Sequence, residues 1–217
     1  MGKLINGIHG PFKGRVGNVI GTFWKGMSVM KVNPANHTDA NTGMQQQQRA
    51  RIKLLSVFMK EFKSLYTLGF TAVDPKTTAF NNAVKYNFEE IIEGVYPDLN
   101  INLSKIRLSI GKLQHVKNPA VMKASDHAVM VSWTDNTNND NAFANDRLHL
   151  CAINAETLEV HIHLTPPARS AGTCLLALPS TWHCNEVFVI GFMAKEEIKK
   201  TQSLKDVSNS LVWNCDL

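Results

Sequence analysis

Hydrophobic and polar residues repeat with two different periods along this chain, and the change of period divides it. From Thr42 to about Leu68, the residues of one mainly apolar face recur at alternating steps of four and three. This spacing predicts an amphipathic helix that ends at Gly69. Thr42 and Gln45 have the spacing of a capping box, a hydrogen-bonding pattern that starts many helices. The recurring positions are Gln48, Ile52, Leu55, Met59, Phe62 and Tyr66.

A second helix is expected after Asp74 and Pro75, because an N-cap residue followed by proline at the first helical position is a common helix start. It would end at Gly94 and form a helical hairpin with the first helix. After Tyr96 and Pro97 the period becomes two, which predicts a strand or a strand pair. The apolar side of the second helix includes Phe80, Ala83, Val84, Asn87, Phe88, Ile91 and Ile92, and that of the strand region Ile101, Leu103, Ile106, Leu108 and Ile110.

From about Asn118 onward, short apolar segments alternate with turn-forming residues, so the pattern predicts strands alone. Seven strands in roughly 100 residues are typical of an immunoglobulin-like or fibronectin-like β-sandwich. Trp133 shares the parity of Val129 and Val131, and it is therefore expected in the sandwich core. The expected strands are residues 121–124, 128–133, 148–154, 159–164, 173–178, 186–193 and 210–214.

The sequence thus predicts an α+β protein in three parts: a Gly-rich basic arm (1–40), a helical hairpin with a strand region (41–117) and an Ig-like β-sandwich (118–217). A hydrophobic content of 44% with 19% charged residues is that of a folded globular protein. The apolar runs are too short to span a bilayer, and the N-terminus lacks a signal-peptide pattern. We therefore expect a cytoplasmic protein with reduced cysteines and no membrane partner. The cysteines are Cys151, Cys174, Cys184 and Cys215.

Glycine is concentrated at the N-terminus, where Gly2, Gly7, Gly10, Gly14, Gly17, Gly21 and Gly26 occur. Ordering glycine costs more backbone entropy than ordering any other residue, so this arm is expected to be flexible alone and ordered by another chain. Its apolar side chains would otherwise be exposed to water. The residues expected to make this assembly contact are Phe12, Val16, Val19, Phe23 and Trp24.

Positive charge is concentrated in the same part of the chain. Residues 1–63 carry ten basic and two acidic side chains, whereas the remaining residues carry thirteen and sixteen. On the first helix, four basic residues fall in one narrow stripe, which indicates either a solvated helix face or a surface for phosphates or acidic protein. The residues expected to bind an anionic partner are Arg15, Lys25, Arg49, Lys53, Lys60 and Lys63.

Metal-binding patterns are weak. His161 and His163 lie two residues apart on one predicted strand, so a zinc site is conceivable, but a solvent-exposed strand face explains the same spacing. The run from Asp135 to Asn141 is rich in oxygen ligands but lacks the glycine and glutamate of a calcium loop, so a polar hairpin loop is expected. The other histidines and cysteines that such a zinc site would recruit are His149, His183, Cys151 and Cys184.

Catalytic patterns are equally weak. The glycines of the arm do not extend to a nucleotide-binding loop, and no serine, cysteine or threonine stands in a recognisable nucleophile motif. Glu89, Glu90 and Glu93 are more typical of a solvated helix face than of a shared proton site. We expect a protein that is not an enzyme and that uses no metal, no cofactor and no small-molecule substrate.

Several motifs give the chain a resemblance to a known group of proteins. The segment from Gly10 to Val19, the Trp24-Lys25-Gly26 triplet and the Gln-rich run before Arg49 resemble an uncharacterised family of short Bacteroidota and phage-type proteins, a domain of unknown function. The resemblance implies a Gly-rich N-terminal arm, a C-terminal Ig-like sandwich and a phage-like context, with no catalytic residue. It continues through residues 79–81, 87, 96–98, 133–135, 168–172 and 208–210.

This chain departs from the family pattern before the first helix. Similar proteins read Asn-Pro-Arg-Thr there, whereas Ala40-Asn41-Thr42 keeps the cap and lacks the arginine. The favoured hypothesis is a structural protein, a capsid- or tail-associated virion component that forms homo-oligomers, or assembles with other virion proteins, through its N-terminal arm. The alternative hypothesis is a nucleic-acid-binding protein that uses the arm and the basic stripe of the first helix.

Overall fold

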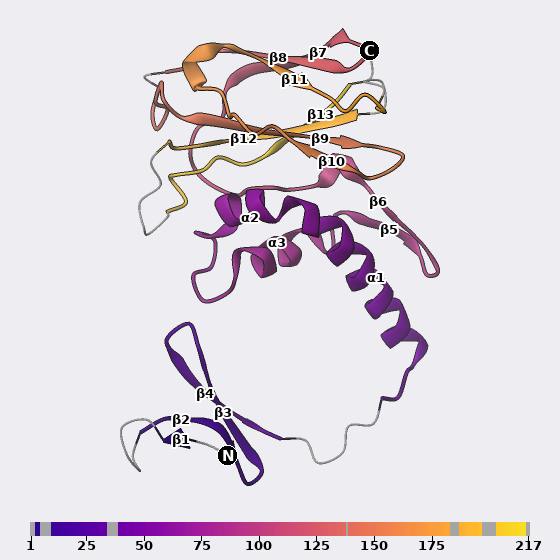
Figure 1. Cartoon of the computed structure of the whole chain (residues 1–217), viewed down its shortest axis with the longest axis vertical. Helices are drawn as coiled ribbons and strands as arrows, with labels where there is room; N and C mark the ends of the chain where they lie inside the picture. Colours follow the sequence, from indigo (N-terminus) through magenta and orange to yellow (C-terminus); the bar gives the residue numbers. More distant parts are fainter. Residues whose placement is uncertain are drawn as a thin grey trace. The chain divides into compact units, whose positions relative to one another are not determined.

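The computed structural model describes residues 3–4, 10–33, 39–137, 139–182, 187–196 and 203–215 (Figure 1). By its internal contacts the chain divides into two compact units, Met1–Gln45 and Gln46–Leu217. The first unit holds a four-stranded antiparallel sheet, and the second holds the helices and three further sheets. The boundary that we predicted near residue 117 does not separate compact units, because the helices share a hydrophobic core with a sheet of the sandwich.

The described residues of the N-terminal arm, for which the sequence predicted no particular secondary structure, form a regular sheet. Short turns connect its three longer strands, and Lys25 and Gly26 both take positive φ angles, 44° and 81°, in the last of these turns. Such a two-residue turn matches the twist of the strands that it joins. The strands, in their order across the sheet, are β1 (Lys3–Leu4), β2 (Phe12–Val16), β3 (Val19–Trp24) and β4 (Met27–Val32).

The first predicted helix is confirmed, including its start. The backbone N–H of Gln45 donates to Oγ1 of Thr42 at 3.4 Å, and the N–H of Thr42 donates to Oε1 of Gln45 at 3.2 Å, which is the reciprocal pair of a capping box. Gly69 does not end this helical segment, because it lies inside the last helix and packs against the backbone of Leu108. The elements are α1 (Gly43–Met59), the 3₁₀ turn η1 (Lys60–Phe62) and α2 (Lys63–Phe70).

The predicted start of the second helix is wrong. Oδ1 of Asp74 accepts the backbone N–H of Lys76 at 2.9 Å in a turn, and the helix α3 (Ala79–Asn87) begins later. Thr78 is its N-cap, with Oγ1 accepting the N–H of Asn81 at 3.2 Å. A second threonine cap therefore takes the role that we had given to the Asp-Pro pair.

The end of the second helix also differs from the prediction. Ile92 and Gly94 belong to strand β5 (Ile92–Val95), which pairs with β6 (Asp98–Ile101) in a hairpin. The expected strand over residues 106–110 is absent from this described stretch, where a 3₁₀ turn, η2 (Leu103–Lys105), leads into an irregular segment. The apolar alternation there reflects burial of Ile106 and Leu108 in the core without strand pairing.

All seven predicted strands of the C-terminal part are confirmed. They are β7 (Lys117–Ser125), β8 (Ala128–Thr134), β9 (Arg147–Asn154), β10 (Val160–Ile162), β11 (Thr173–Ala177), β12 (Val187–Ala194) and β13 (Leu211–Asn214). One sheet has the order β10-β9-β12-β13 and the other β11-β8-β7. The fourth strand of this sandwich, β10, pairs with the third and not with the fifth as in immunoglobulin constant domains. The sandwich is therefore of the fibronectin-like kind.

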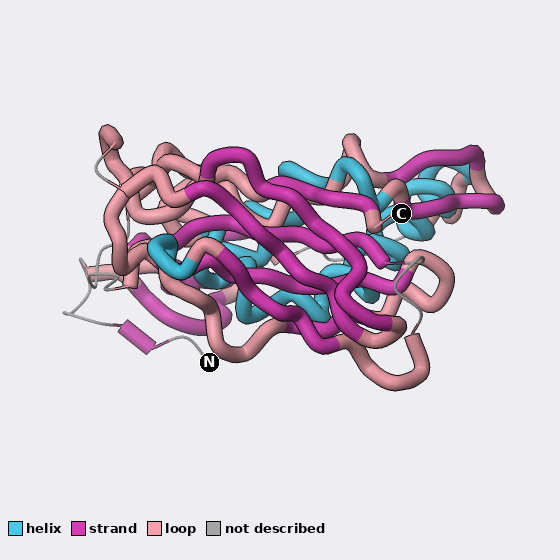
Figure 2. Tube along the Cα trace, turned by 90° about the horizontal axis from the view of Figure 1, so that it is seen from above, coloured by secondary structure: helices cyan, strands magenta, loops and turns pink. Residues whose placement is uncertain are grey.

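The second unit has three layers, with the helices on one side of the four-stranded sheet and the three-stranded sheet on the other (Figures 1 and 2). Strand β9 turns Cys151 and Ile153 toward the helices and Leu148 and Leu150 toward the other sheet. Because both faces are covered, β9 and β12 are almost wholly buried and read as near-continuous apolar runs.

Two further expectations concern single residues. Trp133 is 7% exposed within the core between the two sheets, as predicted. Cys151, Cys174 and Cys215 are free and buried, whereas Cys184 lies outside the described residues. No helix among the described residues combines the length and the apolar character that a membrane crossing needs.

Candidate functional site

The charged side chains of the N-terminal strands β2, β3 and β4 all lie on one face of their sheet. Side chains of cross-strand partners in an antiparallel sheet point to the same side of the sheet. The strand register therefore shows which residues lie on the same face; its pairs include Gly14–Gly21, Gly21–Met30 and Val19–Val32. One side carries no charged side chain on β2, β3 or β4, and we call it the apolar face. Its apolar members are Phe12, Val16, Val19, Phe23, Met30 and Val32.

The opposite side, which we call the cationic face, carries Lys13, Arg15 and Lys31 and no acidic residue. Of the five residues predicted for the assembly contact, four share the apolar face, whereas Trp24 lies on the cationic face beside Met27. Arg15 is also on the cationic face, where its Nε donates to the backbone carbonyl of Gly17 at 3.1 Å. The other predicted arm cation, Lys25, lies in the turn between β3 and β4.

Most of the apolar side chains of this sheet are exposed. The exposed fractions of Val16, Met30 and Val32 are 53%, 70% and 67%. Gly21 alone is buried among the described residues of this unit, beneath the ring of Phe12, which a Cβ at Gly21 would approach to 2.8 Å. The part of this unit that the structure describes therefore has strands and turns but no hydrophobic core of its own.

The basic residues of the first helical segment lie along its outer side. Arg49, Lys53, Lys60 and Lys63 are all exposed on α1, η1 and α2. Glu61 lies among them, so the surface is less uniformly cationic than the spacing indicated. A phosphate contact by these residues stays a prediction.

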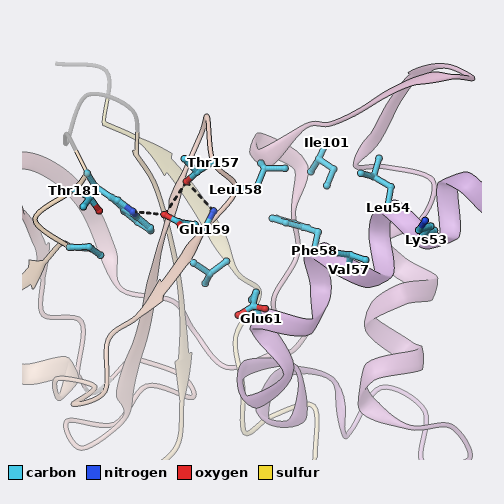
Figure 3. Close-up of a pocket in the computed structure, with 13 residues that line it drawn as sticks. Lys53, Leu54, Val57, Phe58, Glu61, Ile101, Thr157, Leu158, Glu159 and Thr181 are labelled. Atoms are coloured by element: carbon cyan, nitrogen blue, oxygen red, sulfur yellow. Dashed lines mark hydrogen bonds between the residues drawn. The ribbon is translucent and has the colours of Figure 1, made fainter.

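A cavity of about 890 Å³ opens within the second unit, between α1 and the β9–β10 turn (Figure 3). Leu54, Val57 and Phe58 form its helical wall, and Leu158 lies on the facing wall (Figure 3). Val160 and Trp182 also line the cavity. Val57 is 59% exposed although it is apolar. Apolar side chains predominate in the lining, which is typical of a binding pocket.

Three charged residues border this cavity: Lys53, Glu61 and Glu159. The carboxylate of Glu159 is held in place, because its Oε2 accepts Nε1–H of Trp182 at 3.0 Å and the hydroxyl of Thr157 at 3.2 Å (Figure 3). Two carboxylates against one ammonium group give the cavity a negative balance. It is therefore suited to an apolar group that carries positive charge.

Sequence reasoning missed the cavity because its walls come from segments far apart in the chain, such as Val57 and Trp182. One signal was available. Val57 lies outside the predicted apolar stripe of the first helix, so an apolar residue at this position already indicated a second apolar surface.

The histidines do not form a metal site in the described part of the chain. Nε2 of His163 lies 3.4 Å from the hydroxyl of Thr165 and 3.6 Å from Sγ of Cys174. His149 instead stacks on Phe192, and burial lowers the pKa of its imidazole to about 4. Within the described ranges, no three His, Cys, Asp or Glu side chains are placed to hold one metal ion, and His183 and Cys184 lie outside those ranges.

The run from Asp135 to Asn141 forms part of the polar connection between β8 and β9. Oδ1 of Asp135 accepts the hydroxyl of Thr137 and also its backbone N–H, the latter at 2.9 Å, and these two hydrogen bonds lower the pKa of the Asp135 carboxyl. Oδ1 of Asn136 accepts Nη1–H of Arg169 at 2.7 Å inside the protein. The loop thus carries a structural hydrogen bond that sequence reasoning did not foresee.

The fold defines the chain as an α+β protein with a C-terminal fibronectin-like sandwich. The chain belongs to DUF6266, a family of unknown function whose sequence pattern matches residues 11–205. The resemblance to a domain of unknown function is therefore confirmed, while its Bacteroidota and phage origin stays a prediction.

Other comparisons add little to this assignment. No curated protein matches the chain. Among solved structures, the solution structure of the fn3 domain of human collagen alpha-1(XX) chain is similar over 48% of this chain and 87% of that chain, with 12% sequence identity and a TM-score of 0.34.

Proposed function

We propose that this protein is a non-enzymatic structural protein that assembles with other copies of itself through its N-terminal sheet. The observation that carries the proposal is the apolar face, where Val16, Met30 and Val32 are more than half exposed in a unit without a core. A small sheet with a hydrophobic face needs a partner surface to be stable in water.

The edge of the sheet supports the same proposal. Strand β4 is the last in the sheet order, all six of its residues are exposed, and Lys31 is its single charged residue. Natural edge strands are commonly protected by several charges, prolines or bulges against pairing with another chain. An edge with one lysine and no proline is suited to association. The virion setting rests on the sequence resemblance to phage-type proteins.

Deletion of residues 1–38 tests this function, because it removes the sheet and keeps the capping box of Thr42 and Gln45. We expect the full chain to sediment as an oligomer and the truncated chain as a folded monomer. Replacing Val16 and Met30 by serine should weaken the assembly, whereas Val95→Ser, at a site 77% exposed in the second unit, should not. A monomeric full chain, or a truncated chain of unchanged oligomeric mass, would refute the proposal.

The cationic face supports nucleic-acid binding as a second candidate function. Lys13, Arg15 and Lys31 place positive charge on one side of the sheet without an acidic residue, and such a surface attracts phosphates whatever their sequence. We prefer assembly, because phosphate contacts would leave the apolar face exposed to water.

A further inference from the structure

The cavity beside α1 and the turn between β3 and β4 are complementary in chemistry. Trp24 and Met27 pair across this turn, with 48% and 44% of their surfaces exposed, and Lys25 lies in the turn between them. The turn thus presents an aromatic ring, a thioether and a positive charge within four residues. The cavity presents apolar walls with Glu61 and Glu159 at its border.

Charge distinguishes this turn from two other described hairpin turns. The β5–β6 hairpin carries Glu93 and Asp98, and the β7–β8 turn carries Asp126, so carboxylates of the cavity would repel both. Residues 1–45 contain five basic side chains and one acidic side chain. A cavity of about 890 Å³ is also within the size range of pockets that accept groups larger than an indole ring.

We propose that the cavity between α1 and the β9–β10 turn receives the β3–β4 turn of a second copy of this chain. Trp24 and Met27 then pack on the wall that contains Val57 and Phe58, and the ammonium group of Lys25 lies near the carboxylates of Glu61 and Glu159. This inference rests on the proposed assembly function and names the surface that receives the N-terminal sheet.

The geometry of such an interface has a consequence for assembly. The turn and the cavity are different surfaces, so each copy can donate one turn and receive another, either in a closed ring or in an open chain. The apolar face remains available for a further copy. A protein with two such association surfaces is able to build an extended structure.

Full-length variants test the inference by sedimentation. In the turn variant, Trp24 and Met27 are replaced by serine; in the cavity variant, Val57→Lys places a charged side chain on the apolar wall where Trp24 and Met27 should pack. Each change should weaken association at least about thirtyfold, as truncation of a central interface anchor does. Val95→Lys, at another exposed valine in the β5–β6 hairpin, is the matched control and should leave the assembly unchanged.

Mixing the turn variant with the cavity variant is the decisive measurement. The turn variant keeps an intact cavity and the cavity variant keeps an intact turn, so the mixture should form a species larger than either variant alone. Circular dichroism should show that both variants are folded. A charge exchange gives a separate test. The single variant Glu61→Lys should associate more weakly than the wild type, and the double variant Glu61→Lys with Lys25→Glu should recover part of the lost association.

The outcomes separate this inference from the proposed function. If the cavity variant keeps the wild-type mass while the turn variant or the apolar-face variant loses it, assembly through the sheet stands and the cavity is not its receiver. A mixture that shows no new species also overturns the inference. A wild-type chain that is a monomer would overturn both proposals.

Discussion

Nη2 of Arg169 donates to Oδ2 of Asp146 at 2.9 Å, and the two side chains are 0% and 1% exposed. The same guanidinium donates to Oδ1 of Asn136 and to the carbonyl of Gln114, both at 2.7 Å. One arginine therefore ties together the loop before β7, the β8–β9 connection and the turn before β11. A buried charge is tolerated when each of its donors has a partner, as here.

Arg169→Met should destabilise the protein by about 3 to 5 kcal/mol, because it leaves the carboxylate of Asp146 buried without its partner. Urea unfolding monitored by circular dichroism measures this loss. The double variant Arg169→Met with Asp146→Leu should recover part of it, since neither charge then remains buried. A loss below about 1 kcal/mol in the single variant would contradict the structural role.

Trp133→Ala should lower the free energy of unfolding by about 3 to 5 kcal/mol, because it removes a large side chain from the core between the two sheets. Trp133→Phe is the matched control. It keeps an aromatic ring but loses the hydrogen bond from Nε1 to the carbonyl of Arg169, at 2.7 Å, so its cost should be smaller. Equal losses in both variants would show that the hydrogen bond, and not the packing, dominates.

Acid should destabilise the protein between pH 6.5 and 4. Burial lowers the pKa of His149 from 6.5 to about 4, so in this window the unfolded chain binds a proton that the folded chain does not. The free energy of unfolding therefore falls as pH falls, by about 2 to 3 kcal/mol from this group. His149→Gln should flatten the decline in urea titrations at several pH values. Part should remain, because burial also lowers the pKa of His115.

Charge reversal separates assembly from nucleic-acid binding. If Arg49, Lys53, Lys60 and Lys63 contact phosphates, wild-type affinity for DNA or RNA should fall steeply with salt, and replacing all four by glutamate should abolish it. If these residues instead face an acidic surface of another copy, nucleic-acid binding should be weak at physiological salt and the variant should lose its assembly, which is the outcome that we expect. Fluorescence anisotropy at several salt concentrations measures the first effect, and sedimentation the second. Sub-micromolar, salt-sensitive binding by a wild-type monomer would favour the alternative.

Removal of metal ions should leave the protein unchanged. His161 and His163 were the strongest pair for a zinc site, and His163 instead lies beside Thr165 and Cys174. The melting temperature with excess EDTA should equal that without it. A sharp fall, reversed by added Zn²⁺, would show a site that includes residues outside the described ranges.

The sandwich could be predicted from the sequence because its strands are short, apolar and separated by turn residues. Apart from the capped start of the first helix, the helix boundaries could not be predicted, because tertiary contacts decide them. Gly69 stays helical since its missing side chain allows α2 to approach Leu108, and Ile92 becomes a strand since it pairs with Ile101. The Asp74-Pro75 pair, for example, forms a turn before α3 and is not the start of the helix.

The candidate surfaces show the same limit. Period-two spacing could have placed Phe12 and Val16 on one face and Arg15 on the other, but only strand register adds Met30 and Val32 to the apolar face. The cavity depends on Val57 and Trp182 meeting across the fold, which no local pattern encodes. Binding partners remain proposals because none of these contacts identifies a partner by itself.

The four-stranded sheet of the sandwich, β10-β9-β12-β13, has a further consequence for the stability of the sandwich. A sandwich of two antiparallel sheets commonly leaves the outer face of each sheet exposed to water. Here Cys151, Ile153 and Phe192 turn their side chains from β9 and β12 into the helical layer. A fragment of residues 118–217 alone would expose this apolar face to water and would therefore be prone to aggregate. The helices therefore shield an apolar face of the sandwich that would otherwise be exposed to water.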